Sequence, residues 1–333
     1  MSPARFLLKR TLQGVVVVWG VVTVVFGLRV VSPGEPENVL LPPDVSQETR
    51  EQVVAELGLD QPLYVQYLDY LAGLLTGDMG TSLVTRTPAA DRVLSKVPAT
   101  LELAVAATLV AVAIAIPLGV VSATRRHQPA DYGATTFSLV GISTPNFWLG
   151  IMLILLLAVE FGLFPTSGRP DGGLVAVGGA LLAAEFGTAA DRLVAWLHHI
   201  VLPAVTLGTY FTALITRLTR SGMLEELGES YVRTARAKGL PEALVRYKHA
   251  LRNTLIPVIT VLGLQMGTLI GGAVITEAVF DWPGLGTVVI DSIQARDWPV
   301  VQASIVVIGV GFVVLNILVD ALYAYVNPQV SAE

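Results

Sequence analysis

The sequence predicts an all-α integral membrane protein with six membrane-spanning helices. Hydrophobic residues make up 53% of its 333 residues and charged residues only 14%, a balance too apolar for an ordinary soluble domain. A helix needs roughly 20 mostly apolar residues to cross the hydrocarbon core, and helices are favoured because backbone groups in lipid must pair within their own segment. Runs that meet this requirement, some of them loosely, cover residues 12–31, 101–124, 135–159, 200–216, 255–276 and 300–326.

The first of these runs, 12–31, follows Arg5, Lys9 and Arg10. Basic residues also precede the apolar core of a secretory signal peptide. This run, however, is long for such a core, and it shows no small-x-small cleavage site. We therefore expect an uncleaved anchor helix.

The distribution of charge predicts the orientation of the spans. Basic residues are retained on the cytoplasmic side of membranes, and most of the 21 Lys and Arg fall before the first span, at 125–126 or between 217 and 252. The acidic residues from Glu35 to Asp91 fall in the segment on the opposite side. We therefore expect both termini in the cytoplasm.

Two segments on the extracytoplasmic side are long enough to carry structure of their own. Residues 32–98 mix proline, acids and amphipathic pieces, which predicts a small cap. Residues 161–199 contain an apolar piece, 172–184, that is too short to cross and indicates a re-entrant or interface-lying element. We expect this piece to fold over the outer mouth of a pore, with Leu181 and Leu182 covering apolar surface. A loop lying passively on lipid is the alternative.

The cytoplasmic segment between the fourth and fifth spans is dense in basic and small residues. Gly228 and Gly239 punctuate it and predict a short helix over residues 229–238, with Gly239 as its C-terminal cap. The helical spacing places three residues on one side of this helix, namely Tyr231, Ala235 and Lys238.

The composition of this short helix indicates a docking site for another protein. Small residues at Thr234, Ala235 and Ala237 keep its profile thin enough to enter a groove. The residues expected to contact acidic groove edges or carbonyls are Arg233, Arg236 and Lys238, with arginine offering two-point contacts. The alternative is a basic helix lying on anionic lipid headgroups.

Glycines recur at every fourth residue along the fifth span, at Gly263, Gly267 and Gly271. A face without side chains lets another helix approach closely, so we expect helix packing here, either within the chain or with a partner. The general enrichment of glycine in membrane helices is the alternative.

The motifs of several catalytic sites are missing from the sequence. The chain has no cysteine, which excludes disulfides, thiol catalysis and cysteine metal sites. None of its lysines follows a glycine, so it lacks the phosphate loop of ATP-binding proteins. His198 and His199 are adjacent and poorly placed as a metal pair, and we expect them to mark the outer start of the fourth span. We expect no catalytic residue, no metal and no nucleic-acid partner.

An ion-coupled transporter or a channel-like uniporter would place ionisable residues or broken helices near the bilayer midplane. The midplane is almost uncharged here, because the ionisable residues near the spans fall close to helix ends, at Arg29, Glu102, Glu160, Glu277 and Asp320. Prolines at 117 and 145 still allow kinked helices and a cavity, so both alternatives stay open.

The segment from Tyr231 to Pro257 reads YVRTARAKGLPEALVRYKHALRNTLIP. It resembles the cytoplasmic coupling loop of ABC importer permeases, in particular those of oligopeptide, dipeptide and nickel uptake systems. The matching positions are Arg233, Thr234 and Ala235 for a Glu-Ala-Ala-like triplet, then Gly239, then Ile256 and Pro257. The glutamate is absent and the spacing from glycine to proline is longer, which resembles the peptide branch. Further similarity lies at 56–83, 100–103, 143–148, 280–286 and 320–328, so the resemblance covers nearly the whole chain.

The resemblance implies a type I ABC importer permease-like bundle in a prokaryotic cytoplasmic membrane, with di- or oligopeptides as cargo. Residues 1–99 would hold the first span and an extracytoplasmic cap, and residues 100–333 five spans and a coupling loop at 221–254. The ATPase-coupling residues would be Tyr231, Arg233, Thr234, Ala235, Arg236, Lys238 and Gly239. The implied partners are a second homologous permease, two ATP-binding subunits that hold ATP and Mg²⁺, an extracytoplasmic solute-binding protein and membrane lipid. The chain itself would carry no cofactor and hydrolyse no ATP.

Overall fold

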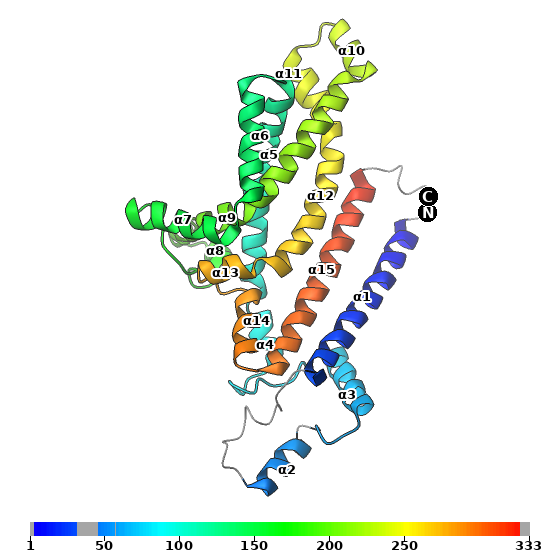
Figure 1. Ribbon diagram of the computed structural model, residues 1–333, viewed down its shortest axis with the longest axis vertical. Coiled ribbons are helices and arrows are strands. Elements are labelled where there is room, and N and C mark those ends of the chain that lie inside the picture. Colours follow the sequence, from blue (N-terminus) through cyan, green and yellow to red (C-terminus); the bar gives the residue numbers. More distant parts are fainter. Residues whose placement is uncertain (1–2, 32–45, 57, 327–333) are drawn as a thin grey trace.

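The computed structural model describes residues 3–31, 46–56 and 58–326. Over these residues the protein is built from helices, and the sole β contact is a bridge between Thr81 and Pro88. The long helices lie side by side in a bundle (Figure 1). One end of the bundle carries α10, Ser230–Ala237, and α11, Glu242–Leu244, and the opposite end carries α2, Gln47–Glu56. The predicted all-α fold is therefore confirmed.

The membrane spans agree roughly with the six predicted. Among the described residues, four helical stretches are long and apolar enough to cross a membrane. They belong to α1 (Pro3–Val31), to α4 and α5 (Ala89–Leu94 and Val97–Thr124), to α9 (Phe186–Gly228) and to α15 (Trp298–Val326). A bent helix pair makes a fifth candidate. The predicted span at 255–276 corresponds to α12, Leu251–Gly272, which lies beside α15.

The predicted third span, 135–159, is not one straight helix. It divides into α6, Pro129–Ser143, and α7, Asn146–Leu153, which continues as the π-helix η2, Ile154–Glu160, at an angle of 104° to α6. The bend falls at Thr144, whose backbone is extended (φ −86°, ψ 123°) directly before Pro145. A proline disfavours the helical conformation of the preceding residue, so one helix ends here and another begins. Of the two prolines that allow a kink, Pro145 accompanies a bend, whereas Pro117 lies within an unbroken α5.

The centre of the bundle is the contact between α5 and α9. Alanines along one face of α5, among them Ala104, Ala107 and Ala111, are buried in a cluster with apolar side chains of α9. A β-carbon on Gly208 of α9 would come within 2.7 Å of the carbonyl oxygen of Ala107, so the two backbones approach closely. Between helices in lipid, such close packing of small residues supplies much of the attraction.

A buried carboxylate joins three helices toward the end that carries α10. Asp131 of α6 accepts hydrogen bonds from Nε and Nη2 of Arg220 in α9, at 2.8 and 3.0 Å. Its carboxylate also accepts from the hydroxyl of Ser122 in α5. The side chain of Asp131 is 5% exposed and that of Arg220 is 30% exposed, so the carboxylate is shielded from the surroundings whereas the guanidinium is partly accessible.

Helix α9 has 43 residues and begins at Phe186, well before the predicted start near residue 200. The expectation that His198 and His199 mark its beginning is wrong, since both lie inside it and His199 Nδ1 is 2.7 Å from the carbonyl oxygen of Ala195, one turn earlier. In this early part of α9, Ala189 and Trp196 are buried, and α9 packs on the segment that precedes it.

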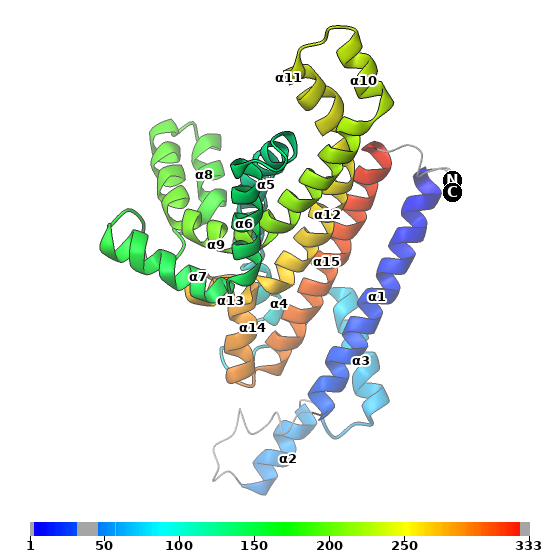
Figure 2. The same cartoon turned by 45° about the horizontal axis from the view of Figure 1, so that its top comes forward.

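The apolar piece 172–184 forms α8, Gly173–Leu182, which packs on α9 (Figure 2). An ion pair anchors the chain just before it, because Nη2 and Nε of Arg169 lie 2.7 and 2.9 Å from the carboxylate oxygens of Glu102 in α5. The indole nitrogen of Trp196 donates to the same carboxylate at 2.9 Å. Leu181 and Leu182 are exposed, and their closure over a pore mouth stays a prediction.

The N-terminal region is fastened to the bundle at two places. In α3, Leu63–Thr76, the hydroxyl of Tyr67 lies 2.6 Å from that of Thr23 in α1. Farther along, the buried carboxylate of Asp297, just before α15, accepts from the backbone N–H of Leu83 at 2.9 Å and from Arg92 at 3.3 Å. Helix α2 buries no residue. Residues 32–45 of the predicted cap lie outside the described residues.

The segment FDWPGLG, Phe280 to Gly286, wraps around a buried carboxylate between α13, Val274–Val279, and α14, Leu285–Gln294. Glu277 accepts hydrogen bonds from Thr100 Oγ1 at 2.7 Å and from the backbone N–H of Gly286 at 2.8 Å. A β-carbon on Gly284 would lie 2.1 Å from Glu277 Oε1, so only glycine fits at that position.

The glycine face of α12 packs within the chain. A β-carbon on Gly263 would lie 2.1 Å from Val319 of α15, and one on Gly267 would lie 2.9 Å from the ring of Phe312. These two glycines therefore let α12 and α15 approach closely. The packing around Gly271 lies outside what the structure describes.

Candidate coupling site

A short helical hairpin projects from the end of α9 (Figures 1 and 2). Helix α9 ends at Gly228, and α10 begins two residues later at Ser230. After α11 the chain continues as the π-helix η3, Val245–Ala250, which leads directly into α12. We call the segment from α10 to η3 the coupling hairpin. The coupling hairpin therefore joins α9 to α12 with almost no intervening linker.

Helix α10 ends in the glycine cap that the sequence predicts. Gly239 has φ +76°, and its N–H donates to the carbonyl of Arg236 at 2.9 Å. The next N–H, that of Leu240, donates to the carbonyl of Ala235 at 3.3 Å. These two bonds form the Schellman motif, which satisfies carbonyls left over at the end of a helix. The predicted helix and its cap are confirmed, with bounds one residue inside the predicted ones.

The inner face of α10 packs on the hairpin itself. Val232 and Ala235, one turn apart, are buried against Val245 of η3, and Leu240 packs on the same cluster. Ala235 was expected to lie on one side of the helix with Tyr231 and Lys238, which are exposed, whereas Ala235 itself is buried. Its methyl group instead helps to hold α10 against η3, because it packs with Val232 and Val245 in one buried apolar cluster.

Tyr231 ties α10 to the two neighbouring long helices. Its hydroxyl donates to the carboxylate of Glu226 in α9 and accepts from Nδ2 of Asn253 in α12 at 3.1 Å. Burial, together with the hydrogen bond to Glu226, raises the pKa of Tyr231 to about 12. The hydroxyl therefore stays protonated at physiological pH and continues to donate.

The outer face of α10 is exposed and basic. Arg233, Thr234 and Lys238 are exposed, and within the described residues neither Arg233 nor Lys238 takes part in an ion pair. Arg236 instead pairs with Glu242 of α11, with 2.9 Å between Nε and Oε1. Because these two side chains are 42% and 46% exposed, the pair contributes only about 0–1 kcal/mol. A partner surface rich in carboxylates would contact Arg233 and Lys238 directly, and Arg236 after exchange with Glu242.

Sequence reasoning found the outer residues of the hairpin and missed those that support it. Val232, Val245, Glu226 and Asn253 hold α10 in place but were not singled out. Val232 lies three residues before Ala235, so the helical spacing of two apolar residues is a signal that identifies the inner face. No comparable local signal marks Asn253, which lies 22 residues from Tyr231.

Two family models match the chain, and both matched ranges extend into α5. Residues 115–332 match the family described as "Binding-protein-dependent transport system inner membrane component". The chain belongs to this family. Residues 3–104 match the model described as "Binding-prot-dependent transport system membrane comp, N-term". The chain is therefore a transport permease, and this assignment replaces the alternatives of an ion-coupled transporter or a channel.

Several relatives align with the permease along almost their full length. The oligopeptide transport system permease protein AppB of Bacillus subtilis is 42% identical over 328 residues, which cover 98% of this chain and 99% of the relative. The dipeptide transport system permease protein DppB of Escherichia coli is 42% identical over 338 residues, with 98% of each chain covered. The di/tripeptide transport system permease protein DppB of Pseudomonas aeruginosa is 45% identical over 321 residues, with 94% of each covered.

The fold of the permease also occurs in a solved transporter. A chain from the inward-facing conformations of the MetNI methionine ABC transporter superposes with a TM-score of 0.53 at 17% identity, covering 71% of this chain and 96% of that one. At this identity the likeness concerns the fold alone. The predicted importer-type bundle is therefore confirmed.

Proposed function

We propose that this permease forms one half of the transmembrane pathway of an ATP-driven importer for di- or oligopeptides. The observation that carries the proposal is the identity of 42–45%, over 94–98% of the chain, with permeases named for oligopeptide, dipeptide and di/tripeptide transport. The aligned length includes the N-terminal region, the FDWPGLG segment and the coupling hairpin. The similarity therefore extends over the whole architecture rather than over one motif.

The complete importer would contain a second homologous permease, two ATP-binding subunits and an extracytoplasmic solute-binding protein. ATP and Mg²⁺ would bind on the ATP-binding subunits, and this chain would not hydrolyse ATP. The coupling hairpin and both termini would lie in the cytoplasm of a prokaryotic cell, because the basic residues gather at that end. Helices α2 and α3 would then face the outside.

The geometry of the coupling hairpin supports a lever-like role in this assembly. Its exposed cations, Arg233 and Lys238, would hold the ATP-binding subunit through charge-assisted hydrogen bonds. Its inner contacts, through Tyr231 and the Val232 cluster, would transmit any displacement to α9 and α12. Helix α9 packs directly on α5 in the bundle core, so closure of the ATP-binding subunits would alter access to the pathway.

The proposal is tested by uptake of a radiolabelled dipeptide and a radiolabelled pentapeptide into proteoliposomes that contain all subunits. We expect ATP-dependent uptake of at least one of them, lost in Arg233→Glu and retained in Arg125→Glu. Arg125 is a matched control because it is an exposed arginine at the same end of the bundle and outside the coupling hairpin. Uptake that persists without ATP, or that is unchanged in Arg233→Glu, contradicts the proposal.

A further inference from the structure

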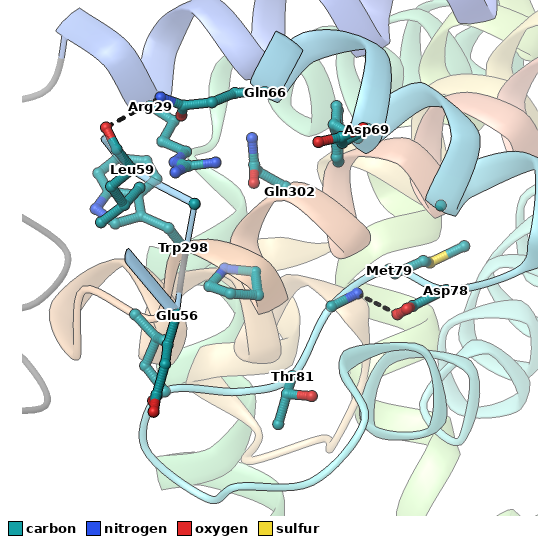
Figure 3. A pocket seen from close by; sticks show the side chains of 16 residues that line it. Arg29, Glu56, Leu59, Gln66, Asp69, Asp78, Met79, Thr81, Trp298 and Gln302 are labelled. Atoms are coloured by element: carbon teal, nitrogen blue, oxygen red, sulfur yellow. Dashed lines mark hydrogen bonds between the residues drawn. The ribbon is translucent and has the colours of Figure 1, made fainter. Parts of the chain in front are cut away.

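A polar pocket (Figure 3) lies toward the end of the bundle opposite the coupling hairpin, where α3 and the start of α15 meet the end of α1 (Figure 1). It forms where the end of α1, helix α3, the chain around residues 78–83 and the first turns of α15 come together. Its volume of about 510 Å³ is within the range of small-molecule sites. None of the residues of the coupling hairpin lines it.

Three hydrogen-bond donors in this pocket lack a partner within the described residues. Gln302 of α15 is 4% exposed, and its side-chain nitrogen is buried with no hydrogen bond. The hydroxyl of Tyr70 in α3 is also buried without a hydrogen bond. The guanidinium of Arg29, at the end of α1, forms no ion pair with any described residue. Figure 3 shows Arg29 and Gln302 directed into the same central space.

The two buried donors, on Gln302 and Tyr70, require an explanation, because a buried polar group without a hydrogen bond is costly and native proteins contain few of them. Arg29 is half-buried beside them. All three groups donate, and one of them is a cation. The group that would satisfy them together is an anionic acceptor, and a guanidinium pairs with a carboxylate through two parallel hydrogen bonds.

The remainder of the pocket has the opposite charge. Asp69 and Glu56 line it, and both are exposed to solvent. Figure 3 shows Asp69 across the central space from Arg29, with Gln302 between them. A simple anion would leave these carboxylates facing it, and a simple cation would leave the three inner donors unpaired. A molecule that carries both charges satisfies both sets of groups.

We propose that this pocket binds a zwitterionic small molecule of the amino-acid or short-peptide class. Its carboxylate is held by Arg29, Gln302 and Tyr70, and its ammonium group faces Asp69 and Glu56. The residues that line the pocket all come from this chain and none belongs to the coupling hairpin, so the proposal goes beyond the role in coupling and transport proposed above.

Calorimetric titration of the purified full-length chain in detergent tests the proposal with three probes. Alanyl-alanine carries both charges, alanyl-alaninamide lacks the carboxylate, and N-acetyl-alanyl-alanine lacks the ammonium group. We expect alanyl-alanine to bind at least tenfold more tightly than either of the other two. Equal binding of the three probes, or no binding of any of them, overturns the proposal.

Variants of Arg29 and Tyr70 then test whether these residues hold the carboxylate of the bound molecule. In Arg29→Gln we expect the preference for alanyl-alanine over its amide to disappear, with both probes bound equally weakly. Tyr70→Phe removes only a hydroxyl and keeps the ring that stacks on Phe26, so it serves where Arg29→Gln does not fold, and it should weaken alanyl-alanine about threefold or more. Arg86→Gln removes an exposed arginine outside the pocket and should change neither affinity.

The result that overturns the assignment is a full preference for the carboxylate in both Arg29→Gln and Tyr70→Phe. Because the titration contains no ATP-binding subunit and measures no uptake, this failure is distinct from a failure of the import proposal.

Discussion

Replacing Gly239 with alanine tests whether the coupling hairpin depends on the left-handed backbone of its cap. Gly239 has φ +76°, and a β-carbon there would meet no atom within 4 Å beyond its chain neighbours. The cost of Gly239→Ala is therefore conformational rather than steric, and it amounts to about 1–2 kcal/mol for a residue with a side chain in this region. Asparagine adopts the left-handed conformation more readily than alanine, so Gly239→Asn should cost less.

Hydrogen exchange at the amide of Leu240 measures this cost directly, because that N–H is bonded to Ala235 through the cap. A loss of 1–2 kcal/mol changes an opening equilibrium by a factor of about 5–30. We expect protection of the Leu240 amide to fall by that factor in Gly239→Ala and by a smaller factor in Gly239→Asn. Peptide uptake per ATP hydrolysed by the reconstituted importer should fall in the same order.

The two variants also distinguish whether Gly239 is needed for the backbone conformation of the cap or for close contact with a partner. If Gly239 serves the cap, asparagine restores much of what alanine loses. Equal loss of uptake in both variants, with normal protection of Leu240, would refute the cap argument and indicate that a partner approaches this position too closely for any side chain.

Three further predictions concern other contacts of the permease. Arg233→Glu should weaken binding of the ATP-binding subunits at least about tenfold at low salt. Arg236→Gln should weaken this binding less, because Arg236 already takes part in a surface ion pair worth roughly 0–1 kcal/mol. Copurification of the ATP-binding subunits with each variant at two salt concentrations compares the two effects. Gly208→Val should destabilise the protein by about 1–3 kcal/mol through overpacking. Gly178→Ala is the control and should leave the stability unchanged, because a β-carbon there meets nothing within 4 Å. Thermal unfolding in detergent measures both variants, and equal unfolding midpoints would contradict the α5–α9 packing argument. Asp131→Asn should cost roughly 2–3 kcal/mol, somewhat less than for a fully buried pair because its arginine is 30% exposed; an unchanged unfolding midpoint would show that the pair contributes nothing.

The sequence by itself determined the features whose cause is local. A run of about twenty apolar residues is a property of neighbours in the chain, so the class of fold and most spans could be predicted from it. The cap at Gly239 could be predicted for the same reason, because the need for a positive φ belongs to a single residue. The bend at Pro145 follows from a clash with the residue just before it, although the angle of 104° does not.

Only the tertiary structure decided which residues face one another. Ala235 turned inward because Val245, from a different helix, covers it. Helix α9 begins at Phe186, earlier than the apolar run predicts, and its early turns include Trp196, which is buried against other segments. Arg29, Tyr70 and Gln302 come from three separate helices, and no periodicity in the sequence relates them. The physical reason is that backbone preferences act over a few residues, whereas the pairing of distant side chains depends on how whole helices pack.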